Sequence, residues 1–75
     1  MRLVKCWEYY FNSINRKYDK RKFAVNIYDI TCFFEYHSKD YNREVLRVFL
    51  NTGAYHDVDM TYKEFCDVIE SEGKE

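Results

Sequence analysis

Apolar and polar side chains alternate along the start of the chain with the period of a β-strand. Over residues 3–12, one side of such a strand carries Leu3, Trp7, Tyr9 and Phe11, and the other carries Val4, Cys6, Glu8 and Tyr10. Because both sides are largely apolar, we expect this strand to be central in its sheet or covered by another element. The polar and basic segment 13–22 that follows is interpreted as a loop.

The middle of the chain predicts further strands separated by turns. Segments 23–27 and 30–37 form two strands or one bent strand, and 38–42 is a cluster of turn residues. Leucine and valine alternate with other residues over 44–50, the sequence Asn51-Thr52-Gly53 predicts a short hairpin turn, and 54–60 returns as the last strand.

The C-terminal segment carries the signals of a capped helix. Thr61 and Glu64 have the spacing of a capping box, in which each side chain satisfies a free backbone N–H of the other residue. The apolar stripe that follows is Tyr62, Phe65, Cys66 and Ile69, and Gly73 is placed to end the helix. The predicted fold is therefore α+β: a single domain over 1–75, with an antiparallel meander of four or five strands and one C-terminal helix packed on the sheet.

The later two-thirds of the chain also resembles a known module. The segments that carry the resemblance are 25–30 (VNIYDI), 45–53 (VLRVFLNTG) and 58–65 (VDMTYKEF). This pattern of two strands, an Asn-Gly-type turn, a strand and a short helix is similar to that of FlbD-like proteins of flagellar operons and, more distantly, to part of the LytTR DNA-binding domains. The resemblance implies a fold and no activity.

Composition narrows the class of protein. Seventy-five residues exclude a large two-domain enzyme, and 47% hydrophobic residues with 20% aromatic residues exclude a disordered chain. The abundance of Lys, Asn, Tyr, Ile and Phe resembles that of small proteins from phages of AT-rich hosts, among which anti-CRISPR and other anti-defence proteins are common. That resemblance implies a viral inhibitor.

Three cysteines without Cys-x-x-Cys spacing favour neither a disulfide framework nor a zinc ribbon, so a reducing, cytoplasmic setting is expected. No apolar run is long enough for a signal peptide or a membrane helix, so no membrane partner is expected.

No constellation of residues predicts catalysis, a cofactor or a resident metal. His37 and His56 have no serine or cysteine nucleophile in a recognisable signature nearby. In the last strand, Asp57 and Asp59 share a side and suit either a divalent cation or solvated edge charges. The cysteines are interpreted as core residues. We therefore expect a protein that is not an enzyme.

The small net charge of −1 conceals two patches of opposite sign. Residues 1–25 hold seven basic and two acidic side chains, whereas 26–75 hold five basic and eleven acidic ones. The basic segment contributes Arg16, Lys17, Tyr18, Lys20, Arg21 and Lys22, which could hold phosphates while a ring stacks on a base. A meander with a C-terminal helix is similar to a family of small single-strand binders, although a pI of about 6.1 is low for a nucleic-acid module.

The acidic patch is predicted to contain Asp57, Asp59, Glu64, Asp67 and Glu70. Such a surface can imitate a phosphate backbone and occupy a basic groove, or it can simply face solvent. The leading hypothesis is a non-enzymatic, phage-derived protein that inhibits a host protein or ribonucleoprotein complex, such as a CRISPR effector. The alternative is a small module that binds single-stranded nucleic acid through the basic segment 16–22. A homodimer is possible, because one helix leaves one face of the sheet uncovered.

Overall fold

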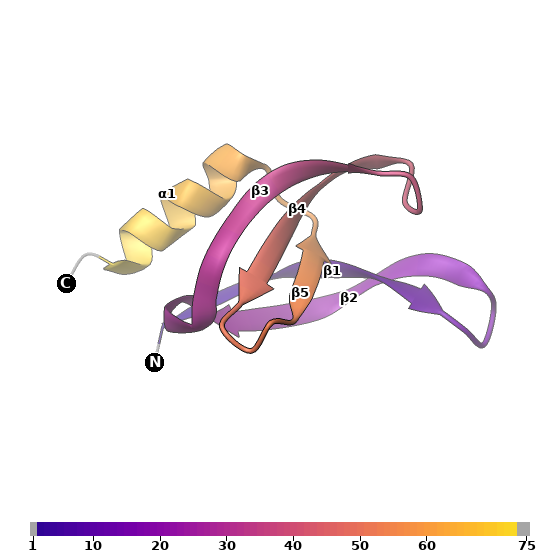
Figure 1. The fold of residues 1–75 in the computed structure, drawn as a ribbon, viewed down its shortest axis with the longest axis horizontal. Coiled ribbons are helices and arrows are strands. Elements are labelled where there is room, and N and C mark those ends of the chain that lie inside the picture. The colour runs from indigo at the N-terminus through magenta and orange to yellow at the C-terminus, as the bar shows by residue number, and fades with distance from the viewer. Residues whose placement is uncertain (1, 74–75) are drawn as a thin grey trace.

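The computed structural model describes residues 2–73 and shows one antiparallel sheet with a single helix (Figure 1). The elements are β1 (Leu3–Asn12), β2 (Lys17–Asn26), the short 3-10 helix η1 (Ile27–Asp29), β3 (Ile30–Ser38), β4 (Arg43–Leu50), β5 (Tyr55–Val58) and α1 (Tyr62–Gly73). Five antiparallel strands and one C-terminal helix confirm the predicted α+β class. Among the described residues, no helix is long and apolar enough to cross a membrane.

The strands lie in the order β2-β1-β5-β4-β3. The β1–β2 hairpin and the consecutive strands β3, β4 and β5 are joined where β5 pairs with β1, with Val58 opposite Glu8. One backbone bond supports this junction, because the Asp59 N–H donates to the Trp7 carbonyl over 2.8 Å. β1 is therefore central, as its two apolar sides predicted, and β2 and β3 are the two edges.

The interpretation of 13–22 as a loop was wrong for its second half. β2 begins at Lys17, and the turn before it contains Arg16, whose φ of 55° is in the left-handed region. Lysine and arginine have low strand propensity, but β1 offers ten residues for pairing, and charged side chains are tolerated on an edge strand because they discourage further pairing. The basic segment is consequently part of the sheet.

One side of the sheet, here called the core face, holds the hydrophobic core. Its buried members are Val4, Val25, Leu46, Val48, Val58 and, from α1, Phe65. Phe65 contacts Phe33 of β3 edge to face, with 4.8 Å between ring centroids. The predicted capping box is present, since the Thr61 N–H donates to Glu64 Oε1 over 2.9 Å and the Glu64 N–H to Thr61 Oγ1 over 3.1 Å. This cap starts α1 where Phe65 can enter the core.

The opposite side of the sheet carries many rings, and we call it the aromatic face. By strand alternation and register its ring-bearing members are Trp7, Tyr9, Phe11, Tyr18, Phe34, Tyr36, Phe49 and Tyr55. Most of them are substantially exposed, from 37% for Tyr36 to 51% for Tyr55. An exposed aromatic surface of this extent on a small domain indicates an interaction site.

Candidate functional site

In the β1–β2 hairpin, two of the three β1 rings on the aromatic face lie opposite lysines and the third lies opposite a tyrosine. Trp7 pairs with Lys22, Tyr9 with Lys20, and Phe11 with Tyr18. Trp7 is the only tryptophan of the chain and is 47% exposed. Flat rings next to ammonium groups can contact a planar ligand and its negative charges together.

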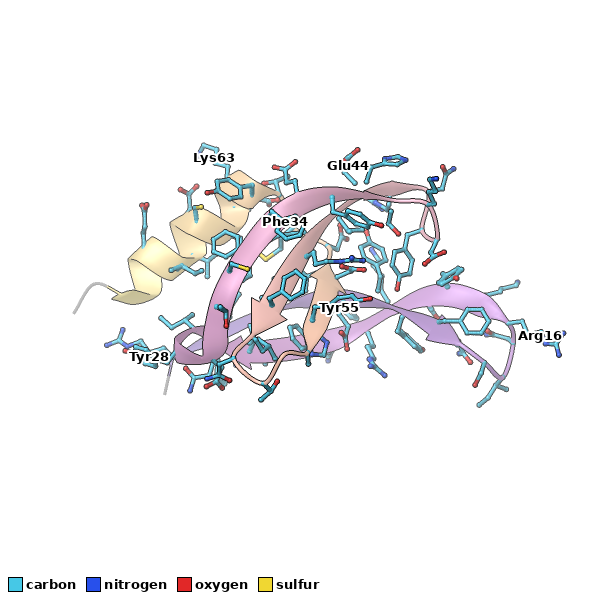
Figure 2. All side chains as sticks on the ribbon, in the orientation of Figure 1. Arg16, Tyr28, Phe34, Glu44, Tyr55 and Lys63 are labelled. Atoms are coloured by element: carbon cyan, nitrogen blue, oxygen red, sulfur yellow. The ribbon has the colours of Figure 1, made fainter. Side chains whose placement is uncertain are left out.

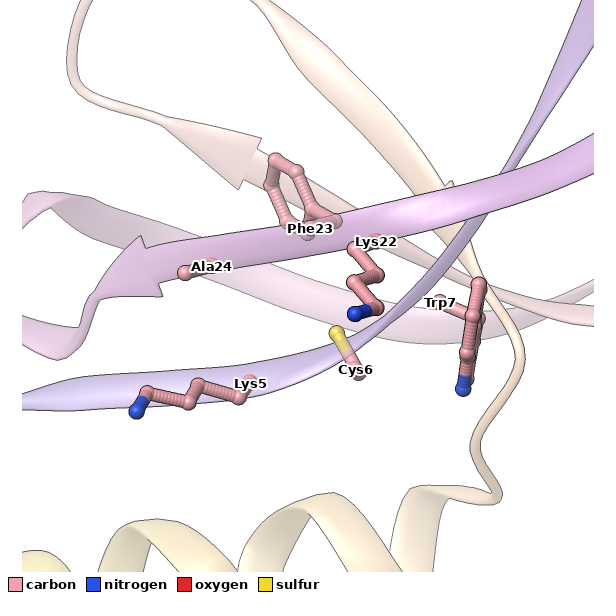
Figure 3. A pocket seen from close by; sticks show the side chains of 6 residues that line it. All are labelled: Lys5, Cys6, Trp7, Lys22, Phe23 and Ala24. Carbon is pink, nitrogen blue, oxygen red and sulfur yellow. The ribbon is translucent and has the colours of Figure 1, made fainter.

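An open hollow of about 420 Å³ lies at Trp7 (Figure 3). It is lined by Lys5, Cys6, Trp7, Lys22, Phe23 and Ala24. Register places the side chains of Lys5, Trp7, Lys22 and Ala24 on the aromatic face. Lys5 and Lys22 are exposed, and neither ammonium group has an ion-pair partner within residues 2–73. The hollow therefore combines one stacking surface with two available positive charges.

Of the other residues in the predicted basic segment, some are exposed and available to a ligand, and others form ion pairs within the protein. Arg16 and Lys17 are exposed near the tip of the hairpin, which Figure 2 shows far from Lys63 on α1. Tyr18 is half-exposed and packs edge to face on Phe11, with 5.1 Å between centroids. The other two bases are engaged on carboxylates.

Lys20 and Arg21 contact acidic partners from opposite faces of β2. Lys20 Nζ lies 3.0 Å from Asp59 Oδ2, and Arg21 Nε lies 2.7 Å from Glu8 Oε1. Both bases also sit over rings, Lys20 over Tyr9 at 6.0 Å and Arg21 over Tyr10 at 4.7 Å. Arg21 therefore joins the two strands of the hairpin and Lys20 joins β2 to the segment after β5, so both bases are less available to a ligand.

Asp57 of β5 and Asp59, which directly follows β5, are neutralised within the protein. Asp57 is buried and accepts two hydrogen bonds from Arg47, at 2.8 and 3.1 Å. Asp59 accepts from Lys20 and lies 3.7 Å from Arg43. The hydrogen bond from Lys20 holds the pKa of Asp59 below its usual value. Neither carboxylate is presented as an uncompensated charge.

The predicted acidic residues do not form one surface. Asp57 and Asp59 point to the aromatic face, whereas α1 packs its Phe65 stripe on the core face. On α1, Glu64 is used in the cap and Asp67 pairs with Lys63 at 3.0 Å, while Glu70 is exposed. The acidic surface of the sequence-based hypothesis is therefore divided between the two sides of the sheet.

A second group of rings on the aromatic face was not identified from the sequence. The Arg47 guanidinium lies between Tyr36 and Tyr55, at 4.1 and 4.3 Å from the ring centroids, and Asp57 fixes it there. Phe34 and Phe49 stack beside it with 5.8 Å between centroids. Figure 2 shows Phe34 and Tyr55 on the β3–β4–β5 part of the sheet. The only sequence signal was the alternation in β3 and β4, which does not say which side a helix covers.

Tyrosine rings from the β1–β2 hairpin and from the β3–β4 turn pack against one another. Tyr41, in the β3–β4 turn, lies 4.9 Å from the rings of Tyr9 and Tyr18, beside a small hollow of about 280 Å³. The Tyr9 hydroxyl is buried and has no hydrogen bond of ordinary geometry within the described residues. Burial raises the pKa of Tyr9 to about 12, and the nearby Asp59 carboxylate adds to the shift. We interpret this cluster as packing that joins the two hairpins.

Another group of polar side chains lies on the core face. Glu8 is buried and its carboxylate contacts His56 Nδ1 at 2.6 Å as well as Arg21. Cys6 precedes it on the same face of β1, and burial, reinforced by Glu8, raises the pKa of its thiol to about 11. A thiol with so high a pKa is a poor nucleophile at neutral pH. Residues 2–73 contain no cluster of His, Cys, Asp or Glu arranged to hold a metal ion.

Alkylation should therefore distinguish the cysteines. Cys32 is exposed on the β3 edge, whereas Cys6 is partly buried with a raised pKa. Iodoacetamide at pH 8 is expected to modify Cys32 first and Cys6 much more slowly, and the rate at Cys6 should still increase between pH 8 and 10 because the thiolate fraction grows. Peptide mass spectrometry measures both rates, and equal rates at pH 8 would contradict this environment for Cys6.

Comparisons with known protein families, with curated proteins and with solved structures found no match to this chain.

Proposed function

We propose that the protein binds single-stranded nucleic acid on the aromatic face of its β1–β2 hairpin. The observation that carries the proposal is the hollow in which exposed Trp7 lies opposite Lys22 and two residues along β1 from Lys5, both of whose ammonium groups are unpaired within residues 2–73. Single-strand binders combine rings that stack on bases with positive charges that follow the backbone. The three free cysteines fit a reducing, cytoplasmic setting for this activity.

The geometry favours a single strand over a duplex. A base can stack on Trp7 only if one of its faces is free, and in a duplex both faces are covered by neighbouring base pairs. Trp7 and Phe11 point to the same side and are four residues apart, which is about 14 Å along an antiparallel strand. Their rings can therefore contact separate nucleotides of one strand, with Arg16 and Lys17 near the tip as further phosphate contacts.

The overall net charge does not oppose this proposal, because the charges are unevenly placed. The aromatic face carries Lys5, Lys20, Lys22, Arg43 and Arg47 against Asp57 and Asp59. Most other acidic residues lie on α1, in turns or on the core face. A local excess of positive charge attracts phosphates at low salt, since screening acts within about 10 Å at 0.1 M.

A matched pair of lysine variants tests the electrostatic part. Lys22→Ala should weaken binding to a single-stranded oligonucleotide and reduce the slope of log K against log salt by about 0.7, because one phosphate contact is lost. Lys63→Ala removes the same charge from α1 and should change neither quantity. Fluorescence anisotropy of a labelled oligonucleotide between about 50 and 200 mM salt measures both. Equal effects of the two variants would show that only net charge matters.

A protein target is the second candidate, in the form of a phage-derived, non-enzymatic inhibitor of a host nucleic-acid-handling complex such as a CRISPR effector. It is supported by Asp67 and Glu70, which remain exposed on α1. Reversing both to lysine separates the two functions, because the change leaves the aromatic face intact. Loss of inhibition with unchanged oligonucleotide binding would assign the activity to α1.

A further inference from the structure

The two edges of the sheet differ in how they are protected. β2 places five charged side chains, from Lys17 and Asp19 to Lys22, along its edge, and such charges oppose pairing with another strand. β3 is nine residues long, is exposed over most of its length, and carries a single carboxylate, Glu35. Along the part of the sheet that the structure describes, β3 is therefore the edge that is open to another strand.

The register shows which backbone groups of β3 are unpaired. The Leu50 N–H donates to the Ala54 carbonyl over 2.9 Å, so the backbone groups of the even residues of β4 point to β5. Those of Val45, Arg47 and Phe49 therefore point to β3 and bond to the residues opposite them, which are Tyr36, Phe34 and Cys32. The N–H and C=O groups of Phe33, Glu35 and His37 consequently point outward from the sheet.

We propose that a second copy of this chain pairs with β3 in an antiparallel ladder centred on Tyr36. Residues that lie opposite each other in such a ladder point to the same side of the sheet. In a symmetric pair of strands the two-fold axis must therefore pass beside one residue that lies opposite its own copy. A centre at Glu35 would place two carboxylates opposite each other. A centre at Tyr36 instead places Glu35 opposite His37 of the second copy, twice, with both backbone groups of each residue bonded. Within one chain Glu35 Oε1 accepts from the Tyr62 N–H over 3.2 Å and His37 Nδ1 contacts Glu44 over 2.9 Å, so Glu35 Oε2 and His37 Nε2 are the atoms that would meet. This complementarity selects a second copy as the occupant.

The pairing gives the exposed rings of β3 a partner. Its two-fold axis is perpendicular to the sheet, so the aromatic faces of both copies lie on the same side of a ten-stranded sheet. Tyr36 of each copy meets the other across the axis, and Phe34 lies beside Ser38 of the second copy. If the proposed function holds, the dimer presents two Trp7 hollows on one side, but the pairing itself needs no nucleic acid.

Cross-linking tests the register. Directly opposite residues in a non-hydrogen-bonded pair have Cα atoms about 4.5 Å apart, which suits a disulfide. With Cys32→Ser as the background, Tyr36→Cys should form a 36–36 disulfide on mild oxidation. Phe34→Cys should not, because its two copies lie about 14 Å apart along the ladder. Faster cross-linking of Phe34→Cys than of Tyr36→Cys would overturn the proposed register.

Sedimentation tests the dimer itself, in the absence of nucleic acid. The wild-type chain should show a concentration-dependent monomer–dimer equilibrium. His37→Pro removes an outward N–H, which a proline on an edge strand does not need, so the monomer should keep its circular dichroism spectrum and lose the dimer. A wild type that stays monomeric at every concentration, or a folded His37→Pro that still dimerises, would overturn the proposal. Either result leaves oligonucleotide binding to be judged separately.

Discussion

Replacing Trp7 with alanine is expected to weaken binding of a single-stranded oligonucleotide by about 5- to 150-fold. The reason is that stacking of one base on an aromatic side chain contributes about 1–3 kcal/mol. Trp7 is half-exposed on the aromatic face and is absent from the hydrophobic core, so its removal should leave the fold intact. Binding is measured by fluorescence anisotropy, and circular dichroism verifies the fold.

The matched control is Tyr28→Ala. Tyr28 is 69% exposed, lies in η1 directly after β2, and does not line the hollow, so its loss removes an exposed ring without changing the site. It should bind the oligonucleotide as the wild type does. If the Trp7 and Tyr28 variants both bind like the wild type, stacking on Trp7 plays no part in recognition.

Phe65→Ala is expected to lower the free energy of unfolding by about 3–5 kcal/mol. Phe65 is fully buried and joins α1 to the sheet through its contact with Phe33. A domain of this length is stabilised by about 4–11 kcal/mol in total, so this single change removes a large share and can unfold the chain. Urea denaturation followed by circular dichroism measures the loss.

Tyr62→Ala provides the comparison on the same helix. The Tyr62 ring also contacts Phe33, at 5.4 Å between centroids, but it is 48% exposed. Its removal leaves less of a cavity and should cost no more than about 1 kcal/mol. If Phe65→Ala costs as little as Tyr62→Ala, α1 does not dock on the core face as described.

Local signals in the sequence were sufficient for several elements of the fold. The capping box at Thr61 and Glu64 depends on two residues three positions apart, and both reciprocal bonds are present. The hairpin turn before β5 needed a residue with positive φ, and Gly53 has a φ of 91°. The two apolar sides of β1 predicted a strand inside the sheet, and β1 does lie between β2 and β5, although the side that carries Trp7 and Phe11 is half-exposed.

The start of β2 could not be predicted in the same way. Residues 17–22 are charged at almost every position, and their strand conformation depends on pairing with β1. The paired residues are thirteen positions apart in sequence for Glu8–Arg21 and five for Asn12–Lys17. Such pairing is a tertiary effect that overrides local propensity. The order of the strands in the sheet could not be predicted from the sequence either, because β5 pairs with β1 across more than forty residues of sequence.

For the candidate site, the sequence identified some residues of the proposed site for a partly different reason. Tyr18 and Lys22 were expected in a basic loop, and they instead lie on the aromatic face opposite Phe11 and Trp7. Trp7 itself was expected in a covered strand, because alternation does not show which of two apolar sides the helix packs on. The negative charge of the acidic patch was overestimated. Arg47 neutralises Asp57 but lies ten residues away in sequence, so the pairing could not be recognised from the sequence.

The most direct test of the proposed function is a titration of the intrinsic fluorescence of Trp7, the only tryptophan, with single-stranded and duplex oligonucleotides of the same sequence. Stacking of a base on the indole should quench its emission saturably with the single strand. Added salt should reverse the quenching, and the duplex should quench far less. Emission that stays unchanged at low salt, with excess single strand present, would contradict nucleic-acid recognition at the Trp7 hollow.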